Sequence, residues 1–162
     1  MLKALPPHKP LRLMLKAGWS ADDLVTSCFL LPSQLRDQVA ALQQDVRAAA
    51  ALRDFALAKG RSLVEIVPED GDATLQLTIH PGASCVQQQS MDTLTLLIDA
   101  KLTVDAGQPA LFEKTYGSGL RAMTHVWKAT SPAQYETAFE ELNKAYTSQI
   151  FWAALEAWLK HQ

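Results

Sequence analysis

The sequence predicts an α+β fold, a two-layer sandwich in which a mostly antiparallel sheet of four to five strands carries two long helices on one face. Segments in which apolar and polar residues alternate indicate strands with one buried and one wet face. Two longer segments repeat apolar residues every three or four positions, which is the period of a helix. The predicted order is strand, long helix, four strands and a closing long helix.

The strands are predicted from this alternation and from the turn residues between them. The most regular segment runs from Thr93 to Val104, and its wet face includes Asp99 and Lys101. It is followed by Asp105–Gln108, where glycine suits a tight hairpin, and by a further strand that ends at Tyr116. The other predicted strands cover residues 11–18, 63–67 and 73–80.

Two stretches next to these strands are predicted to leave the sheet. Pro81–Met91 begins with a proline and contains three consecutive glutamines, so we expect a polar excursion. Gly117–Gly119 is expected to begin a loop, because its two glycines favour irregular backbone.

The two helices are predicted from their apolar faces and from the residues at their ends. The first is expected from Ser33 to Lys59, with Gly60 as the C-terminal cap. Its apolar face comprises Leu35, Val39, Leu42, Val46 and Ala49, extended by Phe55. The second is expected to start with Ser131 as the cap and Pro132 as the first helical residue. Its stripe comprises Tyr135, Phe139, Leu142, Tyr146, Ile150, Ala153 and Ala157.

The domain organisation is expected to be simple. Residues 1–10 contain three prolines and are predicted to form an N-terminal arm, and residues 11–162 a single α+β domain. A chain of 162 residues, 48% of them hydrophobic, is large enough for its own core. No segment is apolar over the length that a bilayer requires, and the first residues do not form a signal peptide. A cytoplasmic protein and an exported protein whose signal lies outside this chain both stay open.

Charge and cysteine content exclude several classes of function. The formal net charge of -2, with scattered basic residues, argues against nucleic-acid binding. Cys28 and Cys85 are too far apart for a local metal or redox motif, which leaves either two buried thiols or one disulfide. The four histidines are widely spaced, so neither a metal nor a cofactor is predicted.

Catalytic groups are sparse in the sequence, and the chain is not predicted to be an enzyme. Asp99 and Lys101 are expected to pair with Glu113 or Lys114 across the hairpin rather than to act as acid and base. Ser118 lacks the frame of a nucleophile elbow and of a phosphate loop. One enzymatic alternative stays open, a small hydrolase with a pocket near His80 and His125 that also includes Asp99.

The aromatic C-terminal third suggests a binding surface. Large apolar side chains there cover more than one face of the last helix, so the second face must be buried in something else. The candidates are the N-terminal region of the chain, a partner chain or second copy, and a lipid-like ligand. The predicted partner-binding residues are Phe151, Trp152, Leu155, Trp158 and Leu159.

The stretch from about Gly71 to Trp158 resembles the small periplasmic lipoproteins of Gram-negative cell envelopes, among them the auxiliary lipoproteins of ABC-type transporters. The resemblance lies in the order and pattern of residues 72–77, 94–104, 112–116 and 135–145. It implies a periplasmic, outer-membrane-associated protein without catalytic residues, which serves transport, secretion or assembly by binding a protein and also a lipid. The lipobox and export signal of the family are absent from this chain. The rival interpretations are a cytoplasmic interaction module, such as a secretion-chaperone-like protein, and the small hydrolase.

Overall fold

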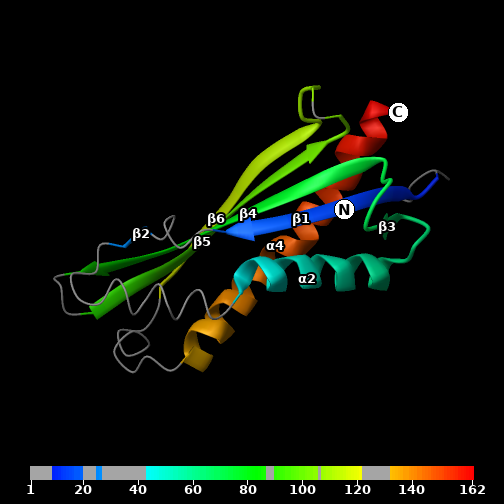
Figure 1. Cartoon of the computed structure of the whole chain (residues 1–162). Coiled ribbons are helices and arrows are strands. Elements are labelled where there is room, and N and C mark those ends of the chain that lie inside the picture. Colours follow the sequence, from blue (N-terminus) through cyan, green and yellow to red (C-terminus); the bar gives the residue numbers. More distant parts are fainter. Residues whose placement is uncertain (1–8, 20–24, 27–42, 87–89, 106, 122–131) are drawn as a thin grey trace.

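A computed structural model describes residues 9–19, 25–26, 43–86, 90–105, 107–121 and 132–162 of the chain. Its main element is a twisted sheet with the strand order β3-β1-β4-β5-β6. The strands are β1 (Leu11–Trp19), β3 (Val64–Ile66), β4 (Ala73–Val86), β5 (Ser90–Thr103) and β6 (Phe112–Arg121). A two-residue strand, β2 (Val25–Thr26), also pairs with β4. Figure 1 shows the long β4, β5 and β6 side by side.

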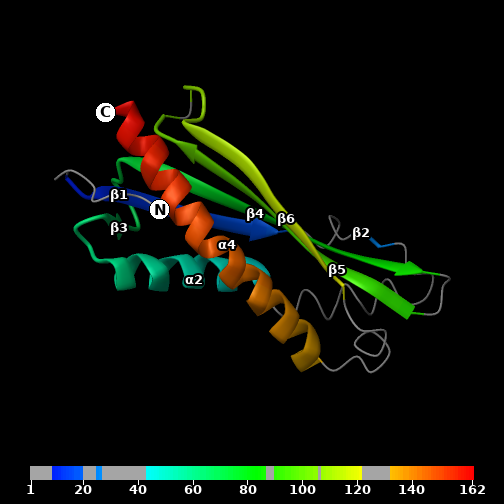
Figure 2. The same cartoon turned by 180° about the vertical axis from the view of Figure 1, so that it is seen from behind.

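The sheet is mixed, and its longest pairings are antiparallel. β5 runs antiparallel to both β4 and β6, whereas β1 runs parallel to β3 and to β4. Helices α2 (Gln44–Lys59) and α4 (Pro132–His161) lie against one face of this sheet. Figure 2 shows α4 crossing in front of the strands, with α2 along the sheet's lower border. The predicted α+β fold class is therefore confirmed.

The core lies between this sheet face and the two helices. Alternate residues of each strand face inward, so Leu75 on β4 and Leu102 on β5 are fully buried neighbours in the register. From the helices, Leu52, Ala56, Ile150 and Leu155 pack against them. Burial of this apolar surface is the main source of stability in a chain of this size.

The segment between β3 and β4 crosses β1, because these two consecutive strands lie on opposite sides of it. The Val67 N–H donates to the Leu13 carbonyl on one side of β1, and the Asp72 N–H donates to the Arg12 carbonyl on the other. At the crossing, a Cβ on Gly71 would lie 2.8 Å from the Arg12 oxygen, so only glycine fits without displacing the backbone. The Asp72 carboxylate accepts a hydrogen bond of 2.9 Å from the Arg12 N–H.

Helix α2 differs from its prediction in both start and phase. Gln43 has a left-handed φ of 49°, so α2 begins at Gln44 and the predicted unbroken helix from Ser33 to Lys59 is wrong, while residues 33–42 lie outside the described part of the chain. The predicted face was also wrong at Val46, which is 55% exposed. Ala49 faces the core as predicted, and Ala48, Leu52 and Ala56 complete the buried face. The predicted cap is confirmed, since Gly60, with φ 102°, donates its N–H to the Ala56 and Leu57 carbonyls.

The predicted excursion at Pro81–Met91 was wrong, because β4 and β5 continue as a hairpin until Val86 faces Ser90. Within this hairpin Pro81 lies opposite Leu96 of β5. The loop predicted at Gly117–Gly119 was wrong as well, since these residues belong to β6. Cys28 and His125 lie outside the described residues, as does the side chain of Cys85.

Helix α4 begins at Pro132, as predicted. The buried stripe in its second half is rotated relative to the prediction. Tyr146 and Ile150 are buried as expected, whereas Ala153 and Ala157 are only half-buried. The side chains of Tyr135, Phe139 and Leu142 lie outside the described part of the chain. The buried positions that replace the alanines are Thr147, Phe151, Ala154, Leu155 and Trp158.

Candidate functional site

The predicted partner-binding residues of α4 divide into two groups. Phe151 and Leu155 are buried, with 3% and 1% of their surface exposed, and Trp158 is 9% exposed. All three belong to the core of this chain, so they hold the fold together. Trp152 and Leu159 are half-buried and form the accessible part of the predicted surface.

Trp152 is connected to the core by a row of aromatic rings. Its ring meets Phe151 edge to face at 4.9 Å between centroids, and Phe151 meets Phe55 of α2 in the same way at 5.0 Å. The Lys59 ammonium lies 5.2 Å from the centre of the Phe55 ring. This row holds the half-buried Trp152 side chain against a rigid support.

A groove of about 510 Å³ runs between α2 and α4. Its walls mix small apolar and charged side chains, namely Arg47, Ala50, Ala51, Asp54, Phe55, Glu140, Asn143, Lys144 and Thr147. Arg47 and Glu140 face each other across it at 4.0 Å. This ion pair between the two helices therefore neutralises part of the groove's charge.

Two amide side chains are buried at one end of this helix pair. Asn143 donates a hydrogen bond of 3.0 Å from Nδ2 to Gln44 Oε1, while Gln44 Nε2 and Asn143 Oδ1 have no partner among the described residues. If both amides were turned over, one donor and one acceptor would still be left. Gln44 is 1% exposed and Asn143 4%, so these unpaired groups carry a desolvation cost.

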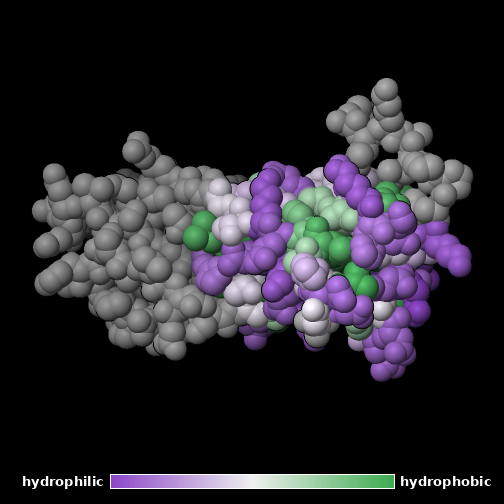
Figure 3. Space-filling model, turned by 90° about the horizontal axis from the view of Figure 1, so that it is seen from above, coloured by the Kyte–Doolittle hydropathy of each residue, from purple (hydrophilic) through white to green (hydrophobic). Residues whose placement is uncertain are grey.

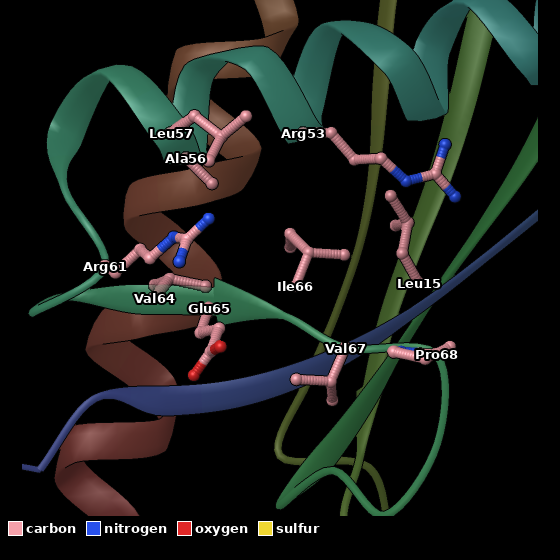
Figure 4. A pocket seen from close by; sticks show the side chains of 10 residues that line it. All are labelled: Leu15, Arg53, Ala56, Leu57, Arg61, Val64, Glu65, Ile66, Val67 and Pro68. Atoms are coloured by element: carbon pink, nitrogen blue, oxygen red, sulfur yellow. The ribbon is translucent and has the colours of Figure 1, made fainter.

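A second groove of about 360 Å³ lies on the other side of α2, above the edge strand β3. Figure 4 shows Ala56 and Leu57 pointing down from α2 and Ile66 pointing up from β3, with Arg53 and Arg61 along the groove. The Glu65 carboxylate points away from α2. Within the described residues neither arginine forms an ion pair. Sequence reasoning missed this site, because its residues come from α2, the turn after it, β3 and β1.

The open face of the sheet is mostly hydrophilic around a smaller hydrophobic patch when the molecule is viewed from the side away from α2 (Figure 3). Asp99 on β5 accepts a hydrogen bond from the Thr115 hydroxyl of β6 and lies 2.9 Å from His80 Nε2 of β4. Of the pairings expected across the hairpin, Asp99 contacts His80 and Thr115 instead of Lys114, while Lys101 lies opposite Glu113 in the register. The side chains of His80 and Asp99 are 30% and 46% exposed and line neither of the two grooves.

Among the described residues, Tyr116 is the ionisable group whose pKa is clearly changed by its surroundings. Its ring lies between Phe112 and Tyr146, at centroid distances of 6.4 and 6.0 Å, and the residue is 4% exposed. Burial raises the pKa of its phenol above the ordinary value of 10.0, because the tyrosinate anion would lose its hydration. This residue belongs to the core. In the described part of the chain, no three His, Cys, Asp or Glu side chains are grouped closely enough to hold a metal ion.

No family profile matches the sequence, and no curated protein is significantly similar to it. Solved structures do share its fold. A Xanthomonas campestris protein of family DUF330 is 17% identical with a TM-score of 0.56, and the match covers 98% of this chain and 92% of that one. A hypothetical protein from Chlamydia trachomatis is 6% identical with a TM-score of 0.51, over 91% and 98% of the two chains.

An uncharacterized lipoprotein B from Nitrosomonas europaea matches with a TM-score of 0.39 and 15% identity, over 96% of each chain. The two stronger matches show a common fold and leave the function to be argued from the surfaces. Among the described helices, none combines the length and the apolar character needed to cross a membrane.

Proposed function

We propose that the chain is a non-enzymatic protein of the cell envelope, on the periplasmic side and in association with the outer membrane. There it would act as an accessory component of a transport, secretion or assembly complex. Its ligand would be a protein, either another chain or a second copy of itself, with lipid as a second kind of ligand. The sequence resemblance to small envelope lipoproteins supports the compartment, and the distribution of exposed side chains supports the binding role.

The observation that carries this proposal is the half-buried Trp152 at the surface end of the aromatic row. Tryptophan provides a large contact area and little conformational entropy to lose, which is why it is enriched at the centres of protein interfaces. Phe151 and Phe55 behind it keep the indole in place before a partner arrives. Leu159 lies two turns further along the same helix and would extend the contact.

A cytoplasmic interaction module of the secretion-chaperone type would use the same surface in another compartment. The hydrolase alternative gains one observation, the 2.9 Å contact between His80 and Asp99. However, that contact lies on an open sheet face and outside both grooves, where a substrate would stay hydrated. The surfaces therefore favour binding over hydrolysis, and the sequence resemblance supports the envelope as the compartment.

The test places a photo-cross-linking amino acid, p-benzoylphenylalanine, at position 152 of the full gene product in the source organism. We expect an adduct with a protein in the envelope fraction. The matched control is position 46, where an apolar side chain is also exposed but on the other helix, α2. Recovery of the protein in the cytoplasm would favour the interaction module, and equal adducts from both positions would refute the Trp152 surface. Trp158 is unsuitable for the test, because it is part of the core.

A further inference from the structure

The β3 strand is an edge of the described sheet, and part of its backbone has no strand beside it. In the parallel ladder, Leu11 donates its N–H to the Leu63 carbonyl and Val67 donates to the Leu13 carbonyl, with Arg12 opposite Glu65. Alternate residues of a strand direct their N–H and C=O groups to the same side. Glu65 therefore faces β1, while the N–H and C=O groups of Val64 and Ile66 point to the open edge.

Helix α2 extends over this edge. Its Ala56 is buried above the sheet, but Leu57, one residue later, is 61% exposed and is the most exposed large apolar side chain of the described residues. Leu57 lines the groove together with Ile66 of β3 (Figure 4). One more strand beside β3 would lie under Leu57 and bury it, just as β1 lies under the inner side of the helix.

The charge of the groove restricts what that strand can be. Its charged lining residues are Arg53, Arg61 and Glu65, and the Glu65 carboxylate points away from α2. Guanidinium groups bind carboxylates strongly, through two parallel hydrogen bonds. A second copy of this chain paired edge to edge by twofold symmetry would bring four guanidinium groups together, and like charges repel.

We propose that the β3 edge binds an extended, acidic peptide segment of a partner protein as an additional strand. Its backbone would pair with the open groups of Val64 and Ile66, one apolar side chain would pack beneath Leu57, and carboxylates would bind Arg53 and Arg61. The three residues of β3 span about 10 Å, so three or four residues of the segment would make the main-chain contacts. This surface is separate from Trp152, and the inference goes beyond the proposed function.

The test uses the full chain, labelled with ¹⁵N, and the blocked peptide acetyl-Thr-Asp-Thr-Val-Thr-Glu-Thr-amide, in which the Asp, Val and Glu side chains share one face of a strand. We expect titration to shift the amide resonances of Val64 and Ile66 first. We also expect the double variant Arg53→Glu/Arg61→Glu to weaken binding at least about tenfold, since it removes two charge-assisted contacts. The matched control Lys16→Glu/Lys101→Glu makes the same change in net charge on exposed residues of the open sheet face and is expected to keep most of the affinity.

Three further arms separate the competing occupants. A peptide methylated at alternate backbone nitrogens should lose binding, and its equal binding would refute strand addition. Phosphatidylglycerol vesicles that bind through the two arginines while the peptide does not would overturn the proposal in favour of an anionic headgroup. Self-association abolished by the arginine variant would overturn it in favour of a second copy. Trp152→Ala should leave the peptide affinity unchanged, so failure here and failure of the proposed function are distinguishable.

Discussion

The two faces of the sheet differ in what covers them, and this difference separates stability from binding. On the covered face, inward residues of β1, β4, β5 and β6 are buried by α2 and α4, and their contacts are made within the chain. On the open face, His80, Asp99 and Thr115 meet each other but stay in contact with water. The groove at β3 lies where the covering helix extends past the sheet. Within the described residues, the open edge of β3, the exposed Leu57 and the two groove arginines all lie at this border between the two faces.

The largest expected effect compares one residue type on the two faces. Leu75 is fully buried on β4, and Leu97 of the neighbouring β5 is 40% exposed on the open face. We expect Leu75→Ala to lower the free energy of unfolding by about 3 kcal/mol, because it leaves a cavity among packed side chains. Leu97→Ala should cost less than about 1 kcal/mol. Urea denaturation of both variants checks this, and equal losses would contradict the assignment of the faces.

The next effect concerns the buried amide pair. Asn143→Ala should lower the free energy of unfolding by about 2 kcal/mol, because it removes the bond to Gln44 and leaves a second buried amide unpaired. The double variant Gln44→Leu/Asn143→Leu removes all the unpaired amide groups and should cost less than Asn143→Ala alone. Denaturation of the set tests this. A double variant less stable than Asn143→Ala would show that further hydrogen-bond partners satisfy these amides.

The faces of the sheet could be predicted from sequence because strand periodicity assigns each residue to one side. In β5 the alternation placed Ile98 and Leu102 inside and Asp99 outside, as the structure has them. The lengths of the strands could not be predicted. Pro81 and Gly117 are locally typical of turns, yet long-range pairing with β5 keeps both in strands. Tertiary pairing overrides local preference in such cases.

The phase of α2 could not be predicted because alanines dominate its inner face. Of these only Ala49 is part of the predicted face. Ala48 and Ala56 also let the helix approach the sheet closely, but their small side chains contribute little to an apolar pattern. Val46 dominated that pattern and is exposed. On α4, side-chain type identified the aromatic residues, but only packing separates the half-buried Trp152 from the buried Phe151. The β3 groove depends on contacts between distant segments, which no local pattern contains.

A smaller loss of stability is expected for a substitution on the open face, where Gly117 of β6 pairs with β5. Gly117 lies opposite Leu97 in the register, and a Cβ at this glycine would lie 2.3 Å from Leu97 Cδ2. Gly117→Ala should therefore force Leu97 into another rotamer, at a cost of about 1 kcal/mol. Thermal unfolding measures the loss. The double variant Gly117→Ala/Leu97→Ala removes the clash, so it should lose less stability than the two single variants lose together. A loss equal to or larger than that sum would contradict this account.

The smallest expected effect is a dependence on pH, and it belongs to the covered face. Burial raises the pKa of Tyr116 in the folded protein, so the folded state retains the phenolic proton at pH values where the unfolded chain releases it. The stability from this residue is complete below the ordinary value of 10.0 and is lost as pH rises through the folded pKa. Tyr116→Phe, which cannot ionise, should lose less stability than the parent between neutral and strongly alkaline pH. Urea denaturation at several pH values tests this, with tyrosinate absorbance followed in parallel. Parallel pH profiles of the two proteins would show that Tyr116 ionises as easily in the fold as in water, and that the covered face is open at β6.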